Sequence, residues 1–176
     1  MKILKLSYDV ENYEGFEVAN GDWSIVDKID GKPLIQEWSP IELKLFDEPQ
    51  KLRSDIPYFV GAPVFSKKAV ELLGSLINNS VEILPIKFDR EEYYIINVVN
   101  LLNCIDFEKS EVVKFRSGRI MKFKKYEFIA DVVSNEHIFK IAEMPQHSVF
   151  VSEEFRNVVL ASNLSGILFE EVWSNN

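Results

Sequence analysis

The chain carries one arrangement of secondary structure twice. In each copy an apolar strand ends in serine, a short amphipathic helix follows, and a second apolar strand closes the unit. The two copies align when Ser66 is placed over Ser152. Ala69 then falls on Phe155. The residues around the repeat include no nucleophile paired with a base and no metal-ligand spacing. The repeat therefore indicates a structural role, without a catalytic or metal site.

Each repeat unit predicts a helix that begins directly after its serine. A serine at this place can cap a helix, because its hydroxyl accepts a backbone N–H from the first turn. Apolar residues then recur at helical spacing over residues 69–77 in the first unit and 155–160 in the second. We therefore expect two short amphipathic helices, each with one buried face.

The rest of the sequence is dominated by short strands and turns. Apolar patterns predict strands at residues 2–7, 41–46, 81–88, 93–99 and 138–141, and residues 47–50 are predicted as a loop. Ser117-Gly118 is predicted as the turn of a β-hairpin. Many strands with only two helices indicate an α+β fold with a mostly antiparallel β-sheet, in which both helices belong to the repeated strand-helix-strand unit.

The chain is expected to form a single domain over residues 1–176. A length of 176 residues is ordinary for one domain, and no linker of low complexity divides it. A shift of composition near residue 60 separates a variable N-terminal β layer, residues 1–60, from the repeat-bearing region, residues 61–173.

The single cysteine, Cys104, indicates a reducing compartment, because it has no partner for an internal disulfide. Cys104 is interpreted as a small buried apolar residue. The N-terminus lacks the apolar run of a signal peptide, and no window approaches the roughly 20 apolar residues of a membrane span. We expect a cytoplasmic protein without a membrane partner.

Patterns typical of cofactor or metal chemistry are absent from the sequence. His137 and His147 are the only histidines, and neither has a Cys or His neighbour at a ligand interval. No two of the seven glycines lie within five residues of each other, which excludes the usual nucleotide-binding loops. We expect no cofactor and no bound metal.

The formal net charge of −8 makes the chain acidic overall. One cluster of basic residues interrupts this acidic chain: six lysines and arginines lie between residues 114 and 125, around the predicted turn. Nucleic-acid binding needs a clustered basic surface, but a solvated hairpin whose charged edges oppose aggregation is the favoured interpretation. We expect no nucleic-acid partner. The acidic excess is compatible with a basic protein partner, which charge can steer toward the chain.

An aromatic residue beside carboxylates gives the best indication of a recognition surface. Trp173 stands near Glu170 and Glu171, and a tryptophan flanked by glutamates suits an apolar anchor with an acidic rim. Asp106 and Glu108 belong to an acidic segment for which a solvated loop is favoured. The candidate partner-binding residues are Glu170, Glu171, Trp173, Asp106 and Glu108.

A family resemblance rests on two stretches, residues 93–100 (YYIINVVN) and 106–110 (DFEKS). The later elements at residues 138–140, 149–153 and 164–173 agree with it. The sequence resembles a predicted immunity protein family of bacterial polymorphic toxin systems, immunity family eleven, which was formerly classed as a domain of unknown function. The resemblance covers roughly residues 60 to 173.

What the resemblance implies is a non-enzymatic antidote, encoded beside a cognate toxin, that neutralises this toxin by protein–protein binding. The family offers no catalytic residues to carry over. Immunity proteins often dimerise, and the sequence leaves a homodimer open.

Two other functions compete with this one. A small-ligand-binding protein or an enzyme would build its site from carboxylates and tyrosines scattered in sequence, such as Asp106, Glu108, Tyr93 and Tyr94. A structural scaffold or homo-oligomer without a toxin is the third alternative. The resemblance and the missing active-site chemistry favour the immunity protein.

Overall fold

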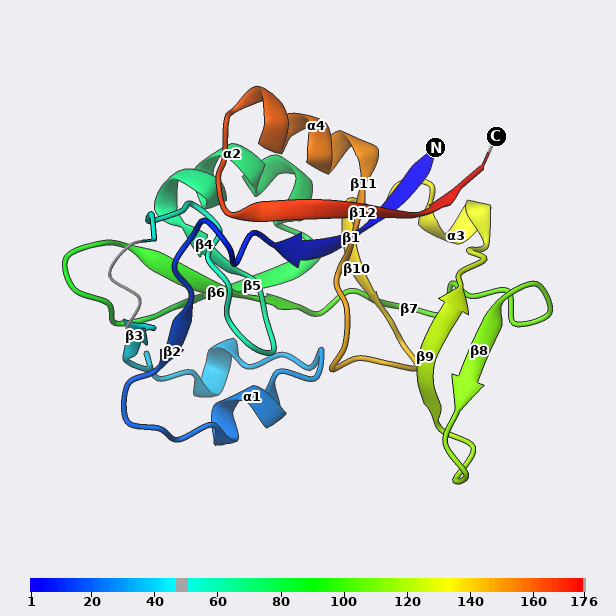
Figure 1. Ribbon diagram of the computed structural model, residues 1–176, viewed down its shortest axis with the longest axis horizontal. Helices are drawn as coiled ribbons and strands as arrows, with labels where there is room; N and C mark the ends of the chain where they lie inside the picture. Colours follow the sequence, from blue (N-terminus) through cyan, green and yellow to red (C-terminus); the bar gives the residue numbers. More distant parts are fainter. Residues whose placement is uncertain (47–50, 176) are drawn as a thin grey trace.

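The computed structural model describes residues 1–46 and 51–175 (Figure 1). The loop predicted at residues 47–50 lies outside this part of the chain. Over the described residues the protein has four α-helices, one short 3₁₀ helix and twelve strands, and most strand pairs are antiparallel. The predicted α+β class is confirmed. Among these helices, none has the length and apolar composition that crossing a bilayer requires.

The largest sheet has five strands and runs through the centre of the molecule (Figure 1). In spatial order its strands are β12 (Ile167–Ser174), β1 (Lys2–Tyr8), β11 (Phe150–Ser152), β10 (Ile138–Ile141) and β7 (Leu101–Leu102). Strand β1 is antiparallel to both of its neighbours, whereas β10 and β7 are parallel. A second sheet has the order β4 (Val64–Ser66), β6 (Tyr93–Val98) and β5 (Val81–Pro85).

Two smaller sheets of two strands complete the β structure. One joins β2 (Phe16–Val18) to β3 (Leu43–Leu45), and the other is the hairpin of β8 (Glu111–Lys114) and β9 (Ile120–Lys125). All of these pairs are antiparallel.

The sequence repeat is a repeat of topology. In the first unit β4, helix α2 (Lys67–Ile77) and β5 enclose the antiparallel strand β6. In the second unit β11, helix α4 (Glu153–Ala161) and β12 enclose the antiparallel strand β1 in the same way. The inserted strand follows its unit directly in the first case and comes from the N-terminus in the second. The first strand of the chain therefore completes the last unit.

The two helices begin where the sequence predicted. The Ser66 hydroxyl accepts a hydrogen bond from the Ala69 N–H at 3.2 Å, and the Ser152 hydroxyl accepts one from the Phe155 N–H at 3.1 Å. Each such cap satisfies an N–H that the helix itself leaves unpaired and contributes about 1 kcal/mol. Both serines act as predicted.

The helices pack against each other over one shared core. Leu73 of α2 and Phe155 of α4 are fully buried, and the rings of Phe65 and Phe155 lie 6.5 Å apart. Because each helix has only one apolar face, packing α2 on α4 and on the strands buries both faces at once. Figure 1 shows the two helices side by side above the strands.

Asp55 ties the two units together outside the core. One of its carboxylate oxygens accepts hydrogen bonds from the backbone N–H and the hydroxyl of Ser165, at 3.1 and 3.2 Å. The other oxygen accepts a hydrogen bond from the Ser66 hydroxyl at 3.3 Å. The cap of α2 and the turn after α4 are thus fixed to the same side chain.

The N-terminal region contains two short helices that the sequence did not predict, α1 (Ser24–Lys28) and the 3₁₀ helix η1 (Ile35–Glu37). Neither has a side-chain cap from its own N-terminal residue. Instead, the Glu82 carboxylate of β5 accepts hydrogen bonds from the backbone N–H groups of Leu34 and Ile35, at 2.7 and 3.2 Å. The 3₁₀ helix is therefore fixed by a contact 47 residues away in sequence.

Besides the core under α2 and α4 and a second core cluster around Phe16 and Ile95, a third core cluster supports the β8–β9 hairpin. It is dominated by aromatic rings: Phe128 packs on Phe139 and on Phe150, with ring centroids 5.9 and 5.5 Å apart. The short helix α3 (Ala130–Val133) follows Phe128 and buries Val133 in the same cluster. This packing fixes the base of the hairpin against the large sheet.

Candidate protein-binding surface

The β8–β9 hairpin forms at the turn that the sequence predicted. Gly118 has a φ of +86°, a conformation that glycine adopts without strain. The Gly118 N–H donates to the Phe115 carbonyl and the Phe115 N–H to the Arg119 carbonyl, both at 2.9 Å. Residues 115–119 therefore close the end of the hairpin.

Aromatic stacking anchors the other end of the hairpin to the body. Phe123 stacks on Tyr126 with ring centroids 4.7 Å apart, and Tyr126 stacks on Phe128 at 5.8 Å. Burial, and to a lesser extent the negative charge of Glu170, raises the pKa of Tyr126. Within residues 1–46 and 51–175 the two strands pair only with each other, and the hairpin stands out from the body (Figure 1).

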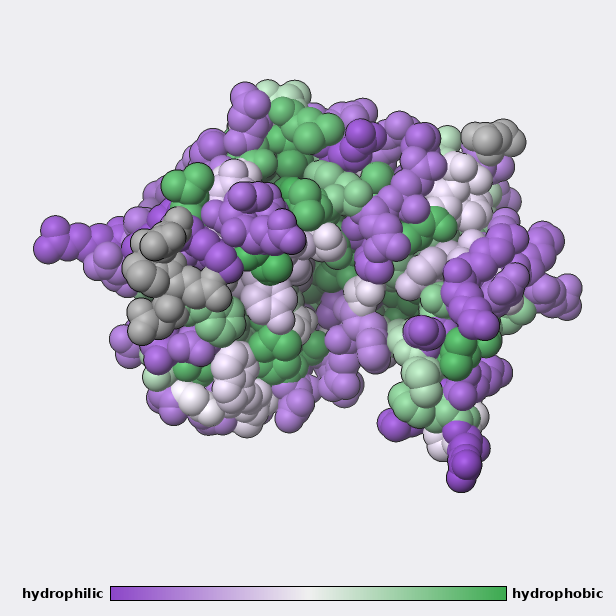
Figure 2. Space-filling view, viewed as in Figure 1, coloured by the Kyte–Doolittle hydropathy of each residue, from purple (hydrophilic) through white to green (hydrophobic). Residues whose placement is uncertain are grey.

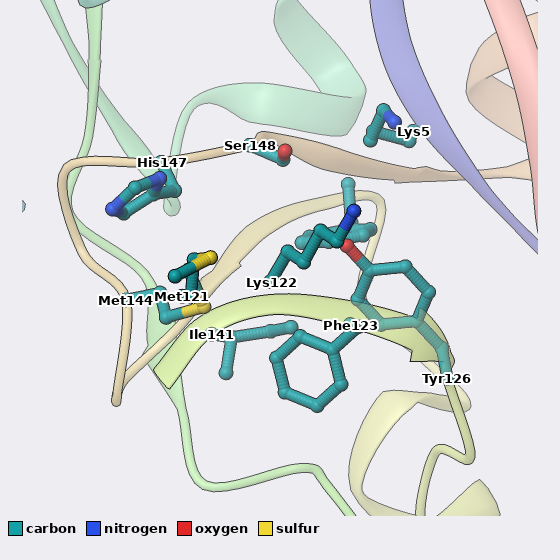
Figure 3. Close-up of a pocket in the computed structure, with 10 residues that line it drawn as sticks. Lys5, Met121, Lys122, Phe123, Tyr126, Ile141, Met144, His147 and Ser148 are labelled. Carbon is teal, nitrogen blue, oxygen red and sulfur yellow. The ribbon is translucent and has the colours of Figure 1, made fainter. Parts of the chain in front are cut away.

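Two adjoining cavities lie between the hairpin and the loop after β10. Their volumes are about 270 and about 720 Å³, and Met121, Met144 and His147 line both of them. Figure 3 shows the smaller cavity, with Lys5 of β1 on one side and Lys122 of β9 on the other. We call the two cavities together the hairpin groove.

The hairpin groove exposes large apolar side chains. Phe107, Phe115 and Met121 line the larger cavity and are 45, 45 and 41% exposed. Apolar side chains gathered at one concave place typically mark an interaction site. Figure 2 shows the hairpin projecting at the lower right, hydrophilic at its tip and less polar on the side that faces the body.

The charge of the hairpin is opposite to that of the rest of the chain. Residues 111–125 hold six lysines and arginines and one glutamate, a net charge of +5, while the whole chain carries −8. The remaining residues therefore carry −13. Of the six cations only Lys125 has an ion pair within the described residues, with Glu127 at 3.8 Å. The basic charge of the hairpin is left almost unneutralised.

The predicted partner-binding residues of β12 are engaged within the chain. Glu171 pairs with Lys2 at 2.8 Å and Glu170 with Lys5 at 2.5 Å, which joins β12 to β1. The Trp173 indole N–H donates to a Glu127 carboxylate oxygen at 3.2 Å, and its half-buried ring packs against the third core cluster. Whether these three residues contact a partner stays a prediction.

The predicted acidic loop lies close to Trp173. The Asp106 N–H donates to the Glu127 carbonyl at 2.9 Å, so Glu127 contacts both segments. The Asp106 carboxylate accepts from the Lys109 ammonium at 2.9 Å, and this bond is the main reason why its pKa is lowered. Glu108 is exposed beside it. Asp106 and Trp173 therefore both lie beside the segment that follows the hairpin, while Glu170 and Glu171 are paired with Lys5 and Lys2 of β1.

The residues of the alternative carboxylate and tyrosine site are not brought together. The Tyr93 hydroxyl donates to the Ser54 carbonyl at 2.8 Å, and burial raises the pKa of Tyr93 to about 12. The Tyr94 hydroxyl donates to Glu92. Both tyrosines lie at the start of β6, at the left of Figure 1, while the turn with Asp106 and Glu108 precedes β8 at the right.

The structure also shows the surroundings of the Cys104 thiol and the His137 imidazole. Cys104 is buried, and burial raises the pKa of its thiol to about 12, which confirms the interpretation as a small apolar residue. The Nδ1 atom of His137 lies 2.9 Å from the Ser152 hydroxyl, where it extends the cap of α4. In residues 1–46 and 51–175 no three His, Cys, Asp or Glu side chains converge as a metal site would require.

Sequence reasoning missed the hairpin groove. Its two walls come from β9 and from the loop of residues 143–147, which are not adjacent in sequence. The one signal was the basic cluster, which was interpreted as a solvated edge. Exposed phenylalanine and methionine at residues 115 and 121, on either side of the turn, could have pointed to a binding surface.

Comparison with protein families identifies a match over the C-terminal half of the chain. A family model described as "Immunity protein family (Imm11)" matches residues 86–174, which is slightly more than half of the chain. The matched part begins after β5 and includes β6, the hairpin, both walls of the groove and the whole second repeat unit. A comparison with curated proteins found no match.

Proposed function

The chain belongs to the immunity protein family (Imm11), and we propose that it binds and neutralises a cognate bacterial toxin encoded by a neighbouring gene. Neutralisation takes place by protein–protein contact, and the chain makes or breaks no bond in the toxin. The family match over residues 86–174 is the observation that carries this proposal.

The hairpin groove supports binding to a protein. Inhibitory interfaces bury about 1,600 Å² in total and depend on a few central anchors, often aromatic, inside a polar rim. Phe107, Phe115 and Met121 supply apolar anchors, and Lys114 and Arg119 supply the polar rim.

The acidic remainder of the chain supports a second contact. Glu127 links Asp106 to Trp173 beside the hairpin, and Lys5, which pairs with Glu170, lines the smaller cavity of the groove. An interface centred on the groove can therefore extend over the predicted residues to a basic patch of the toxin. These residues are Glu170, Glu171, Trp173, Asp106 and Glu108.

Co-expression with the toxin domain of the neighbouring gene tests the proposal. We expect the tagged chain to retain the toxin domain through purification and size-exclusion chromatography. The expected Kd is about 10⁻⁹ M or lower, which is typical of inhibitory complexes. A toxin domain of similar charge from an unrelated system serves as the control. Two separate elution peaks and no measurable heat of binding would contradict the proposal.

A further inference from the structure

We propose that the hairpin groove binds an extended acidic segment of the toxin, which pairs with β9 as an added strand. This inference rests on the proposed function and specifies which part of the toxin meets which surface. Three independent features of the groove carry it: the charge of its walls, the free edge of β9 and the adaptable apolar floor.

The charge of the groove selects an acidic occupant. Lys114, Arg119 and Lys122 line its two cavities, and none of them has an ion pair in the part of the chain that the structure describes. Glu143 is the one carboxylate among the lining residues. Complementary charge accelerates association and rejects partners of the wrong sign.

The backbone of β9 offers hydrogen bonds to an extended segment. Strand β9 pairs with β8 on one side only, and no backbone hydrogen bond joins its other edge to any further segment of the described chain. Figure 1 shows this edge on the side of the loop that forms the other groove wall. A peptide that adds a strand gains affinity from such main-chain bonds.

The apolar floor of the groove, formed by Met121 and Met144, fits an added strand whose apolar and acidic side chains alternate. Side chains of an added strand point to opposite faces in turn, so every second residue can contact Met121 and Met144 while the others reach the cations of the walls. Methionine side chains are flexible and polarisable and therefore adapt to different apolar partners. An acidic segment with interspersed apolar residues fits both requirements.

Two other occupants fit the groove less well. A nucleic-acid backbone carries no peptide N–H and C=O groups that could pair with the free edge of β9. A second copy bound groove to groove would bring two hairpins of charge +5 together, because a two-fold contact places the same surface on both sides.

Two matched double variants of the full chain test the assignment. Lys114→Glu with Arg119→Glu reverses two charges that line the groove, and Arg116→Glu with Lys124→Glu reverses two exposed charges of the same hairpin that do not. Both pairs change the net charge equally. We expect the groove pair to weaken toxin binding at least tenfold more than the control pair, as measured by calorimetry, with unchanged circular dichroism.

A peptide probe tests the chemistry of the groove without the toxin. We expect a fluorescein-labelled octapeptide of alternating glutamate and valine to bind the wild type and the control pair but not the groove pair. An octapeptide of lysine and valine is expected not to bind. Equal binding of the two peptides, tighter binding of single-stranded DNA, or self-association that the acidic peptide does not displace would overturn the assignment.

The toxin experiment separates the two proposals. If the toxin domain binds the wild type and both double variants with equal affinity, the groove assignment fails and the immunity function stands. If the toxin domain does not bind the wild type, the immunity function fails, and the assignment of a toxin segment to the groove fails with it.

Discussion

Replacing Gly166 with alanine is expected to lower the free energy of unfolding by about 4 kcal/mol. Gly166 has a φ of +90°, which L side chains rarely adopt. A Cβ atom there would meet the Ser54 hydroxyl and lie 2.6 Å from the Ile56 carbonyl oxygen. The Ile56 backbone is held against this turn, because its N–H donates to the Ser165 carbonyl at 3.0 Å. The backbone strain and the steric overlap are therefore expected to add.

Gly118→Ala is the matched control for this effect. Gly118 has a φ of +86°, close to that of Gly166, but apart from its two chain neighbours no residue in the described part of the chain has an atom within 4 Å of its added Cβ. The control therefore carries the backbone strain alone, about 1 kcal/mol. Urea denaturation of both variants measures the difference. Equal losses of stability in the two variants would show that close packing at Gly166 is not what the fold requires.

The second large effect concerns Lys140, which is fully buried in β10. Its ammonium donates one hydrogen bond, to the Pro145 carbonyl at 2.9 Å. Burial lowers the pKa of Lys140 from 10.5 to about 8, and the charge of Asp30 offsets part of this effect. At pH 7 the amine is protonated in the folded and the unfolded chain. The full free-energy cost of burying the charged ammonium therefore lowers the stability of the folded protein.

The sign of the pH dependence follows from these two pKa values. Between pH 8 and pH 10.5 the unfolded chain binds a proton that the folded protein has released. The free energy of unfolding therefore rises with pH across this window, by about 3 kcal/mol in total. Lys140→Met lacks this contribution. We expect its stability relative to the wild type to be greatest at pH 7 and to fall by about 3 kcal/mol by pH 10.5.

Chemical denaturation of both proteins at pH 7 and pH 10.5 measures this change. Lys124→Met, which removes an exposed lysine of the hairpin, is the control for the loss of one positive charge. If the two variants change in the same way relative to the wild type, burial of Lys140 does not govern the pH dependence.

The sequence predicted those parts of the fold that are set by local patterns. The repeat, both amphipathic helices and their serine caps, and the hairpin turn at Gly118 depend on residues within a few positions of each other, and the structure confirms them. The spacing of apolar residues decides which helix face is buried, so these elements can be inferred from one sequence.

The parts that were missed depend on distant contacts. Strand β1 lies between β11 and β12, but its sequence does not indicate which strands it pairs with. The 3₁₀ helix is held by Glu82 from another strand. Lys140 is buried in β10, which lies between β11 and β7, and the short pattern of residues 138–141 does not reveal these neighbours.

The candidate surface could be predicted only in part. The basic cluster is visible in the sequence, but its place opposite Met144 and His147 is set by the fold. Of the five predicted acidic and aromatic residues, Asp106 and Trp173 lie near each other, because Glu127 contacts both of their segments. The double variants of the hairpin test whether the groove contacts the toxin.

Growth of cells that produce the toxin of the neighbouring gene tests the claim of an antidote most directly. We expect cells that also produce this chain to grow as fast as cells with an inactivated toxin, and cells without the chain to stop growing. Growth arrest that persists when the folded chain is present in excess over the toxin would contradict the claim.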